Sequence, residues 1–200
     1  MEAYIVKKIG VVAGIVLLAL ASGCGSSYEE YGKNVMKFAK DGSLTETIRE
    51  EFDEEVYDKD DLVASVEEEV ASYNENSGDE SVDLKKCKVS DGQAVVEMEY
   101  DSAETYAQFN QAKVYQGTIS TFSESEYHAY SDLKDMEGKQ ISLSSIVASG
   151  DEYNIIALNM DCIVEVKGTI CYVSGDVEFI SDEAANVTGN DEAYAYIVYK

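Results

Sequence analysis

Residues 82–110, VDLKKCKVSDGQAVVEMEYDSAETYAQFN, carry the clearest fold signal of the chain. Two strand-like runs, 82–90 and 93–100, flank Asp91-Gly92, a dipeptide that readily adopts the positive φ angles of a two-residue type I′ turn, and the second run places Ala94, Val96, Met98 and Tyr100 on one face. This pattern predicts a β-hairpin. Asp101 or Ser102 follows as a helix N-cap, and the spacing of the next aromatic residues predicts a short helix that ends near residue 110.

The same hairpin signature occurs earlier in the chain, where Asp41-Gly42 separates residues 34–40 from residues 43–52. The later arm is ambiguous, because Leu44, Ile48 and Phe52 fit one face of a helix as well as one face of a strand. A strand is favoured, because threonine at positions 45 and 47 and the preceding Asp-Gly turn suit a hairpin. We therefore expect a second hairpin with a type I′ turn.

A helix is expected between these hairpins. Asp58 is a suitable N-cap, and a stripe of apolar residues at helical spacing follows it until Asn76-Ser77-Gly78 ends the pattern. This stripe consists of Leu62, Val66, Val70 and Tyr73. The first half of the domain thus has the order hairpin, helix, hairpin, helix, a ββαββα-like arrangement.

From residue 113 onward the pattern favours strands. They are expected at residues 114–121, 126–130, 154–159, 162–167, 169–174, 177–180 and 193–199, separated by Gly, Asp and Asn signals. Residues 133–149 are expected to form a loop with a short helical turn around Ser144. The fold class is therefore α+β, with antiparallel hairpins and two helices followed by a mostly antiparallel β part.

The N-terminus carries an export signal. Lys7 and Lys8 precede an apolar run of twelve residues, 9–20, which is shorter than the ~20 residues of a membrane-spanning helix. Small residues and a cysteine then follow, as Leu20-Ala21-Ser22-Gly23-Cys24. The alternative is an ordinary secretory signal that happens to contain a cysteine.

This segment resembles the lipobox of bacterial lipoproteins, and the whole pattern is similar to small Gram-positive surface lipoproteins of unknown function. The resemblance implies cleavage before Cys24, lipid attachment to its thiol, and a location on the extracytoplasmic face of the cell membrane. The family prefers Leu at the position that Ala21 occupies here. The expected organisation is a signal peptide over residues 1–23, a lipidated cysteine and tether over 24–33, and a single α+β domain over 34–200.

The charge of the chain limits its partners. Without Lys7, Lys8 and Glu2, the 15 Lys and Arg become 13 and the 40 Asp and Glu become 39, a net charge near −26. Nucleic acid is excluded as a partner, because its phosphates require a basic surface. The 45% of hydrophobic residues and the 15 tyrosines supply enough apolar surface for a folded domain. The acidic surface also repels anionic lipid, so the attached lipid is expected to hold the protein at the membrane.

The chain has three cysteines in addition to Cys24, namely Cys87, Cys162 and Cys171. If Lys167-Gly168 were a tight hairpin turn, Cys162 and Cys171 would be diagonal neighbours at roughly 7 Å, which is too far for an unstrained disulfide. Reduced cysteines that pack as small apolar residues are favoured, and a bulged hairpin with a disulfide is the alternative. Their spacing does not indicate a zinc site.

Motifs for catalysis are weak. His128 is the single histidine, and no GxSxG, GxxxxGK[ST] or GxGxxG sequence occurs, so neither a nucleophilic triad nor a nucleotide site is indicated. Asp58-Lys59-Asp60 fails as a calcium loop because Leu62 and Val63 occupy positions that need an oxygen ligand and a glycine. No metal, cofactor or catalytic residue is expected.

Tyrosines are the best ligand-binding candidates. Tyr127 and Tyr130, and Tyr194 and Tyr196, form two clusters, and alternate positions in a strand place Tyr194 and Tyr196 on one face. Half-buried sheet tyrosines are the alternative explanation. We expect a membrane-anchored, non-catalytic module that binds an unknown protein or glycan. The alternatives are a glycan hydrolase with paired carboxylates and a structural envelope protein.

Overall fold

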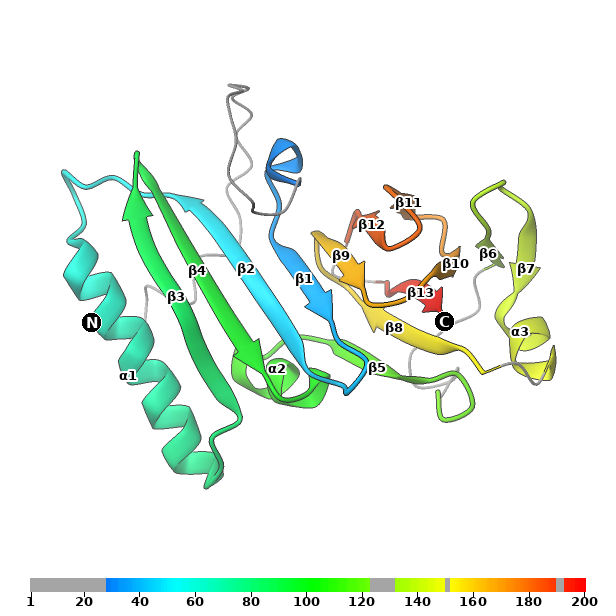
Figure 1. Cartoon of the computed structure of the whole chain (residues 1–200), viewed down its shortest axis with the longest axis horizontal. Coiled ribbons are helices and arrows are strands. Elements are labelled where there is room, and N and C mark those ends of the chain that lie inside the picture. The colour runs from blue at the N-terminus through cyan, green and yellow to red at the C-terminus, as the bar shows by residue number, and fades with distance from the viewer. Residues whose placement is uncertain (1–27, 123–131, 150–151, 190–192) are drawn as a thin grey trace.

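The computed structural model describes residues 28–122, 132–149, 152–189 and 193–200. Within these ranges the chain forms an α+β fold with three α-helices and two mostly antiparallel β-sheets of seven and six strands (Figure 1). The α+β class expected from the sequence is confirmed. Strands dominate, and the helices are few.

The seven-stranded sheet, sheet A, is built from both ends of the domain. Its order is β11 (Val177–Phe179), β12 (Ala184–Val187), β9 (Cys162–Val166), β1 (Val35–Phe38), β2 (Leu44–Glu51), β4 (Gln93–Tyr100) and β3 (Val82–Ser90). All neighbours are antiparallel except β1 and β9, which run parallel. That parallel pair joins the two hairpins of the first half to strands from the C-terminal part.

The six-stranded sheet, sheet B, contains only strands that follow residue 113. Its order is β5 (Val114–Thr118), β8 (Asn154–Leu158), β13 (Ala195–Tyr199), β10 (Ile170–Val173), β6 (Asp132–Lys134) and β7 (Gln140–Ser142). The helices are α1 (Lys59–Ser77), α2 (Ala103–Asn110) and α3 (Leu143–Ser149), with a short 3-10 turn, η2, at Glu29–Tyr31.

The two Asp-Gly dipeptides form different turns. Asp91 and Gly92 have φ angles of 55° and 74°, and Ser90 pairs directly with Gln93, so the predicted type I′ turn is confirmed. In the first hairpin only Gly42 has a positive φ, 97°, and Phe38 pairs with Leu44 across a five-residue loop. The type I′ turn predicted there is wrong.

The side chain of Asp41 explains this difference. Its carboxylate accepts hydrogen bonds from the backbone N–H and the hydroxyl of Ser43, at 3.1 and 2.7 Å, which lowers the pKa of Asp41. This local hydrogen bonding stabilises a longer loop in which Gly42 occupies the left-handed position. Residues 43–52 nevertheless form a strand, as expected.

Both predicted helices are confirmed at their capping residues. The carboxylate of Asp58 accepts from the N–H of Asp60 and of Asp61, and Gly78 ends α1 in the left-handed conformation. Ser102, and not Asp101, caps α2, because its hydroxyl accepts from the N–H of Thr105 at 3.0 Å. The apolar stripe of α1 packs against the main core.

One face of sheet A, here the inner face, carries the main core. Helices α1 and α2 cover its β3–β4–β2 half, while sheet B covers its β1–β9–β12 half (Figure 1). The side chains buried at the second contact include Met36, Phe38, Val164, Ile156 and Ile197. Burial of this continuous apolar surface, at roughly 25 cal/mol per Å², is the main stabilising contribution. The other face of sheet B packs against α3 in a second, smaller core.

Residues 162–174 form the two strands predicted from the sequence, but not the tight hairpin considered as their connection. Strand β9 belongs to sheet A and β10 to sheet B. Gly168 lies where a side chain would overlap the backbone carbonyl of Lys200, and Thr169 exchanges backbone hydrogen bonds with Lys200. The chain therefore crosses between the sheets at Gly168, and β10 pairs with β13.

The described cysteines are all reduced. Cys162 is buried in the main core, while Cys87 and Cys171 are half-buried. Because Cys162 and Cys171 lie in different sheets, the diagonal placement that the hairpin would give them does not arise. Burial raises the pKa of the Cys162 thiol far above its ordinary value, which suits a packing role.

Three strands of the C-terminal half were not expected. Strands β6 and β7 and helix α3 lie where the sequence predicts a loop with one helical turn, and β12 lies in a stretch with no strand prediction. The strand predicted from residue 114 ends at Thr118 and not at 121. The strand predicted at 126–130 lies outside the described residues.

Residues 28–33, at the start of the described chain, pack on the opposite face of sheet A, here called the outer face. The ammonium of Lys33 bonds to the carboxylate of Asp161 at 2.9 Å, the side-chain oxygen of Asn186 at 2.7 Å and the carbonyl of Val187 at 2.9 Å. Tyr28 is half-buried, and its pKa is raised by burial and by the nearby carboxylates of Glu165 and Glu183. Residues 28–33, which the sequence places in the tether, therefore pack against the domain.

Candidate functional site

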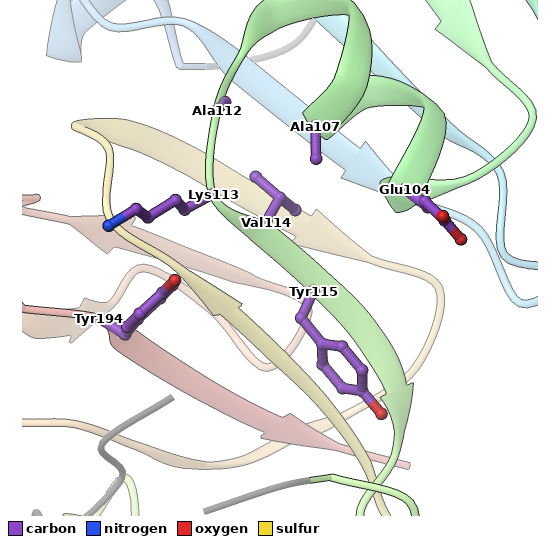
Figure 2. A pocket seen from close by; sticks show the side chains of 7 residues that line it. All are labelled: Glu104, Ala107, Ala112, Lys113, Val114, Tyr115 and Tyr194. Atoms are coloured by element: carbon purple, nitrogen blue, oxygen red, sulfur yellow. The ribbon is translucent and has the colours of Figure 1, made fainter. Parts of the chain in front are cut away.

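An open depression of about 400 Å³ lies where α2 meets the edge of sheet B (Figure 2). Its lining comes from α2, from the connection into β5, from β5 itself and from the residue that precedes β13. These lining residues are Glu104, Ala107, Ala112, Lys113, Val114, Tyr115 and Tyr194. It combines one acid, one base and two phenol rings on a single open surface.

The end of α2 creates this depression. Gln111 adopts a left-handed conformation with φ 52°, and the N–H of Ala112 donates to the carbonyl of Ala107, so the chain turns sharply into β5. Strand β5 lies at one edge of sheet B and pairs with β8, which pairs with β13. The sheet pairing thus brings Tyr194, far away in the sequence, beside Lys113 (Figure 2).

The ring of Tyr115 is held by its own neighbours. Its hydroxyl lies 3.1 Å from the hydroxyl oxygen of Thr121, and its ring centroid lies 5.3 Å from that of Phe122. At the other side of the depression, Glu104 accepts a hydrogen bond from the amide of Gln108 at 3.2 Å. The held ring of Tyr115, together with a second tyrosine and two charged groups in the same lining, suits the recognition of a sugar ring or a polar peptide by stacking and hydrogen bonds.

The structure separates the tyrosines that the sequence proposes as ligand-binding residues. Tyr194 is half-buried and lines the depression. Tyr196 is only 3% exposed and packs against Phe122, with ring centroids 6.1 Å apart, so little of its ring is available to a ligand. Tyr127 and Tyr130 lie outside the described residues, as do His128 and Cys24.

Sequence reasoning did not single out Glu104, Lys113 or Tyr115. Each is an ordinary residue of a helix, loop or strand, and only the pairing of β5, β8 and β13 brings them near Tyr194. A usable signal exists for Lys113, because it lies in the three-residue connection between α2 and the edge strand β5. Such connections often lie at the rim of a binding surface.

A second notable feature is the carboxyl group of Glu46, which is buried in the main core. Glu46 occupies an inner-face position of β2 between Leu44 and Ile48 and is 5% exposed. It accepts hydrogen bonds from the hydroxyl of Tyr106 at 3.2 Å and the side-chain amide of Asn34 at 3.5 Å. An acidic residue at an apolar position of an alternating strand was the available sequence signal.

Burial dominates the protonation of this cluster. It raises the pKa of Glu46 to about 7, although the hydrogen bonds from Tyr106 and Asn34 oppose the shift. Burial likewise raises the pKa of Tyr106 and of Tyr100, and the nearby carboxyl of Glu46 adds to both shifts. Glu46 does not line the depression, so we assign it to the packing of α2 on β2 and not to ligand contact.

Metal binding has no geometric support in the described part of the chain. Across residues 28–122, 132–149, 152–189 and 193–200, no group of three or more His, Cys, Asp or Glu side chains is arranged to hold a metal ion. Within the same ranges, no helix has the length and apolarity needed to cross a bilayer.

Comparison with known proteins yields no relative. No protein-family model matches the chain. No curated protein matches its sequence, and no solved structure matches its fold. Any function must therefore be argued from the residues themselves.

Proposed function

We propose that this protein is a lipid-anchored extracytoplasmic lipoprotein whose domain is a non-catalytic binding module. The lipobox-like segment that ends at Cys24 supports the anchor. The binding role rests on one observation, the depression that places Lys113, Glu104 and two tyrosine rings on a shared open surface. The bound ligand is a protein or a glycan of the cell envelope.

The lining of the depression favours binding over two-acid hydrolysis. A glycosidase needs two carboxyl groups about 5 to 9 Å apart across the scissile bond. Glu104 is the single acidic residue among the seven that line this depression. A purely structural envelope protein would not need a concave surface lined by two tyrosine rings, which counts against that alternative.

The anchor is tested by changing Cys24. Cells that express the protein are fed an alkyne fatty acid, and the protein is compared with its Cys24→Ser variant. We expect label and membrane association for the wild type and loss of both in the variant. An unlabelled wild type would contradict the proposal.

The binding role is tested with soluble peptidoglycan fragments and envelope peptides, followed by NMR chemical-shift changes. Tyr194→Ala and Lys113→Ala should each weaken a detected interaction about tenfold or more, the loss that about 1.4 kcal/mol produces. Tyr57→Ala is the matched control, because Tyr57 is 55% exposed and lies in the loop before α1. Equal loss in all three variants would contradict a site at the depression.

A further inference from the structure

The acidic charge of this protein is distributed unevenly across sheet A. Helix α1, which covers the inner face, carries one lysine and six acidic residues among its 19 residues. The strand residues that point to the outer face are close to neutral. They comprise five basic residues (Lys37, Arg49, Lys85, Lys86 and Lys88) and six acidic residues (Glu51, Asp83, Glu97, Glu99, Glu165 and Glu178).

Strand register explains this balance. Residues that alternate with the core positions of β3 and β4 face outward, so Lys86 lies opposite Glu97 and Asp83 lies opposite Glu99. Lys85, at a register shift in β3, bonds to both Asp83 and Glu99, at 2.6 and 2.5 Å. Asp83 and Glu99 are thereby neutralised in place.

Two lysines of this face can contact anionic groups outside the protein. Lys86 and Lys88 are exposed, and across the described ranges neither forms an ion pair. Lys37, in contrast, pairs with Glu165 at 3.3 Å on the same face. In a chain with a net charge of −25, an exposed surface with free ammonium groups is repelled by anionic lipid less than the acidic side that carries α1.

The start of the described chain lies on the same face. Lys33 anchors residues 28–33 beside β9 and β12 of the outer face. Cys24 precedes Tyr28 by four residues, which span at most about 14 Å when fully extended. A lipid on Cys24 would therefore hold Tyr28, and with it this side of sheet A, within about 14 Å of the lipid-anchored residue.

We infer that the outer face of sheet A is the membrane-facing surface of the anchored protein, and that Lys86 and Lys88 contact anionic lipid headgroups. This inference rests on the proposed lipid anchor. Helix α1 and the depression beside α2 belong to the inner side of sheet A, so they face away from the membrane. The ligand site is thus presented to the envelope and not to the lipid.

Lysine footprinting tests this orientation. The full-length lipidated protein is placed in vesicles of phosphatidylcholine, with or without phosphatidylglycerol, and treated with a membrane-impermeant acetylating reagent. We expect Lys86 and Lys88 to react about fivefold more slowly in anionic vesicles than in detergent micelles. Lys59 of α1 should react equally in both, and 1 M salt should remove the effect of phosphatidylglycerol.

Paired charge reversals provide the control. Lys85 lies on the same face and should also react more slowly in anionic vesicles, so it reports on this face when Lys86 and Lys88 are replaced. Lys86→Glu/Lys88→Glu should abolish this protection of Lys85, whereas Lys134→Glu/Lys139→Glu, with the same net charge, should preserve it. Equal reaction of Lys59 and Lys86 in anionic vesicles, or protection of Lys59 instead, would overturn the inference. Flotation with the vesicles separates the two ideas: a protein that fails to float refutes the anchor and the orientation, while one that floats without protection refutes the orientation alone.

Discussion

The two faces of sheet A are built from the same strands but differ in chemistry, since one is apolar and buried and the other carries most of the charged strand residues. The inner face buries apolar side chains together with one carboxyl group, Glu46, that has no charged partner among the groups that shift its pKa. The outer face presents charged side chains that pair across neighbouring strands. We therefore expect side-chain packing on the inner face to set the stability of the fold, and charged side chains on the outer face to set its electrostatic character. The following predictions test that contrast.

The largest effect is expected for a core aromatic. Phe38→Ala removes a side chain that is 1% exposed on the inner face of β1, and should lower the free energy of unfolding by about 3 to 5 kcal/mol. Its neighbour Lys37 points to the outer face, so Lys37→Ala should cost about 1 kcal/mol or less. Urea denaturation measures both. Similar losses would contradict the assignment of the two faces.

The next effect concerns Glu46 and depends on pH. Because burial raises its pKa from 4.5 to about 7, the folded state loses stability relative to the unfolded state as the pH rises through that interval. Glu46→Gln keeps a hydrogen-bond acceptor but cannot ionise. The variant should match the wild type near pH 4 and exceed its stability by about 3 kcal/mol at pH 8.

Urea titrations at a series of pH values measure this difference between Glu46→Gln and the wild type. Glu97→Gln on the outer face of β4 is the control, and its stability should follow the wild-type pH profile. Parallel profiles for Glu46→Gln and the wild type would show that Glu46 ionises as freely as a surface carboxylate.

A smaller effect is expected for the hydroxyl that contacts Glu46. Tyr106→Phe removes the hydrogen bond at 3.2 Å and should lower the free energy of unfolding by about 1 to 2 kcal/mol. Because that hydrogen bond lowers the pKa of Glu46, its removal should also move the pH profile to higher values. Tyr73→Phe, whose hydroxyl bonds to the exposed side chain of Gln108, should leave the profile unchanged. A profile that stays in place in Tyr106→Phe would contradict the contact.

The smallest effect is expected on the outer face. Lys85→Gln disrupts a lysine that bridges Asp83 and Glu99, and because these groups are exposed, the change in stability should be slight and should disappear in 1 M salt. Thermal melts at low and high salt measure it. A large, salt-independent loss would mean that Lys85 contributes through packing.

Local patterns were sufficient to predict the first half of the domain. Asp58, Ser102, Asp91-Gly92 and the alternating residues of β4 each determine nearby backbone structure, so the ββαββα order followed from short-range chemistry. Similar local reasoning failed at Asp41-Gly42, where a side-chain hydrogen bond to Ser43 selects another turn.

The candidate site and the C-terminal topology depend on long-range pairing. The parallel contact of β1 with β9 and the crossing at Gly168 follow from how two sheets pack, which residues 162–174 alone do not encode. The depression likewise requires Lys113 and Tyr194 to meet through β8. Tyr194 could be proposed because an aromatic cluster is visible in the sequence. Its charged neighbours could not.

The most direct test of this account is the intact mass of the mature protein extracted from host membranes. We expect a chain that begins at Cys24 and carries the additional mass of a diacylglyceryl group, with no such species from Cys24→Ser. A mature protein with the mass of the unmodified polypeptide, or with a first residue other than Cys24, would contradict the anchor and with it the proposed orientation.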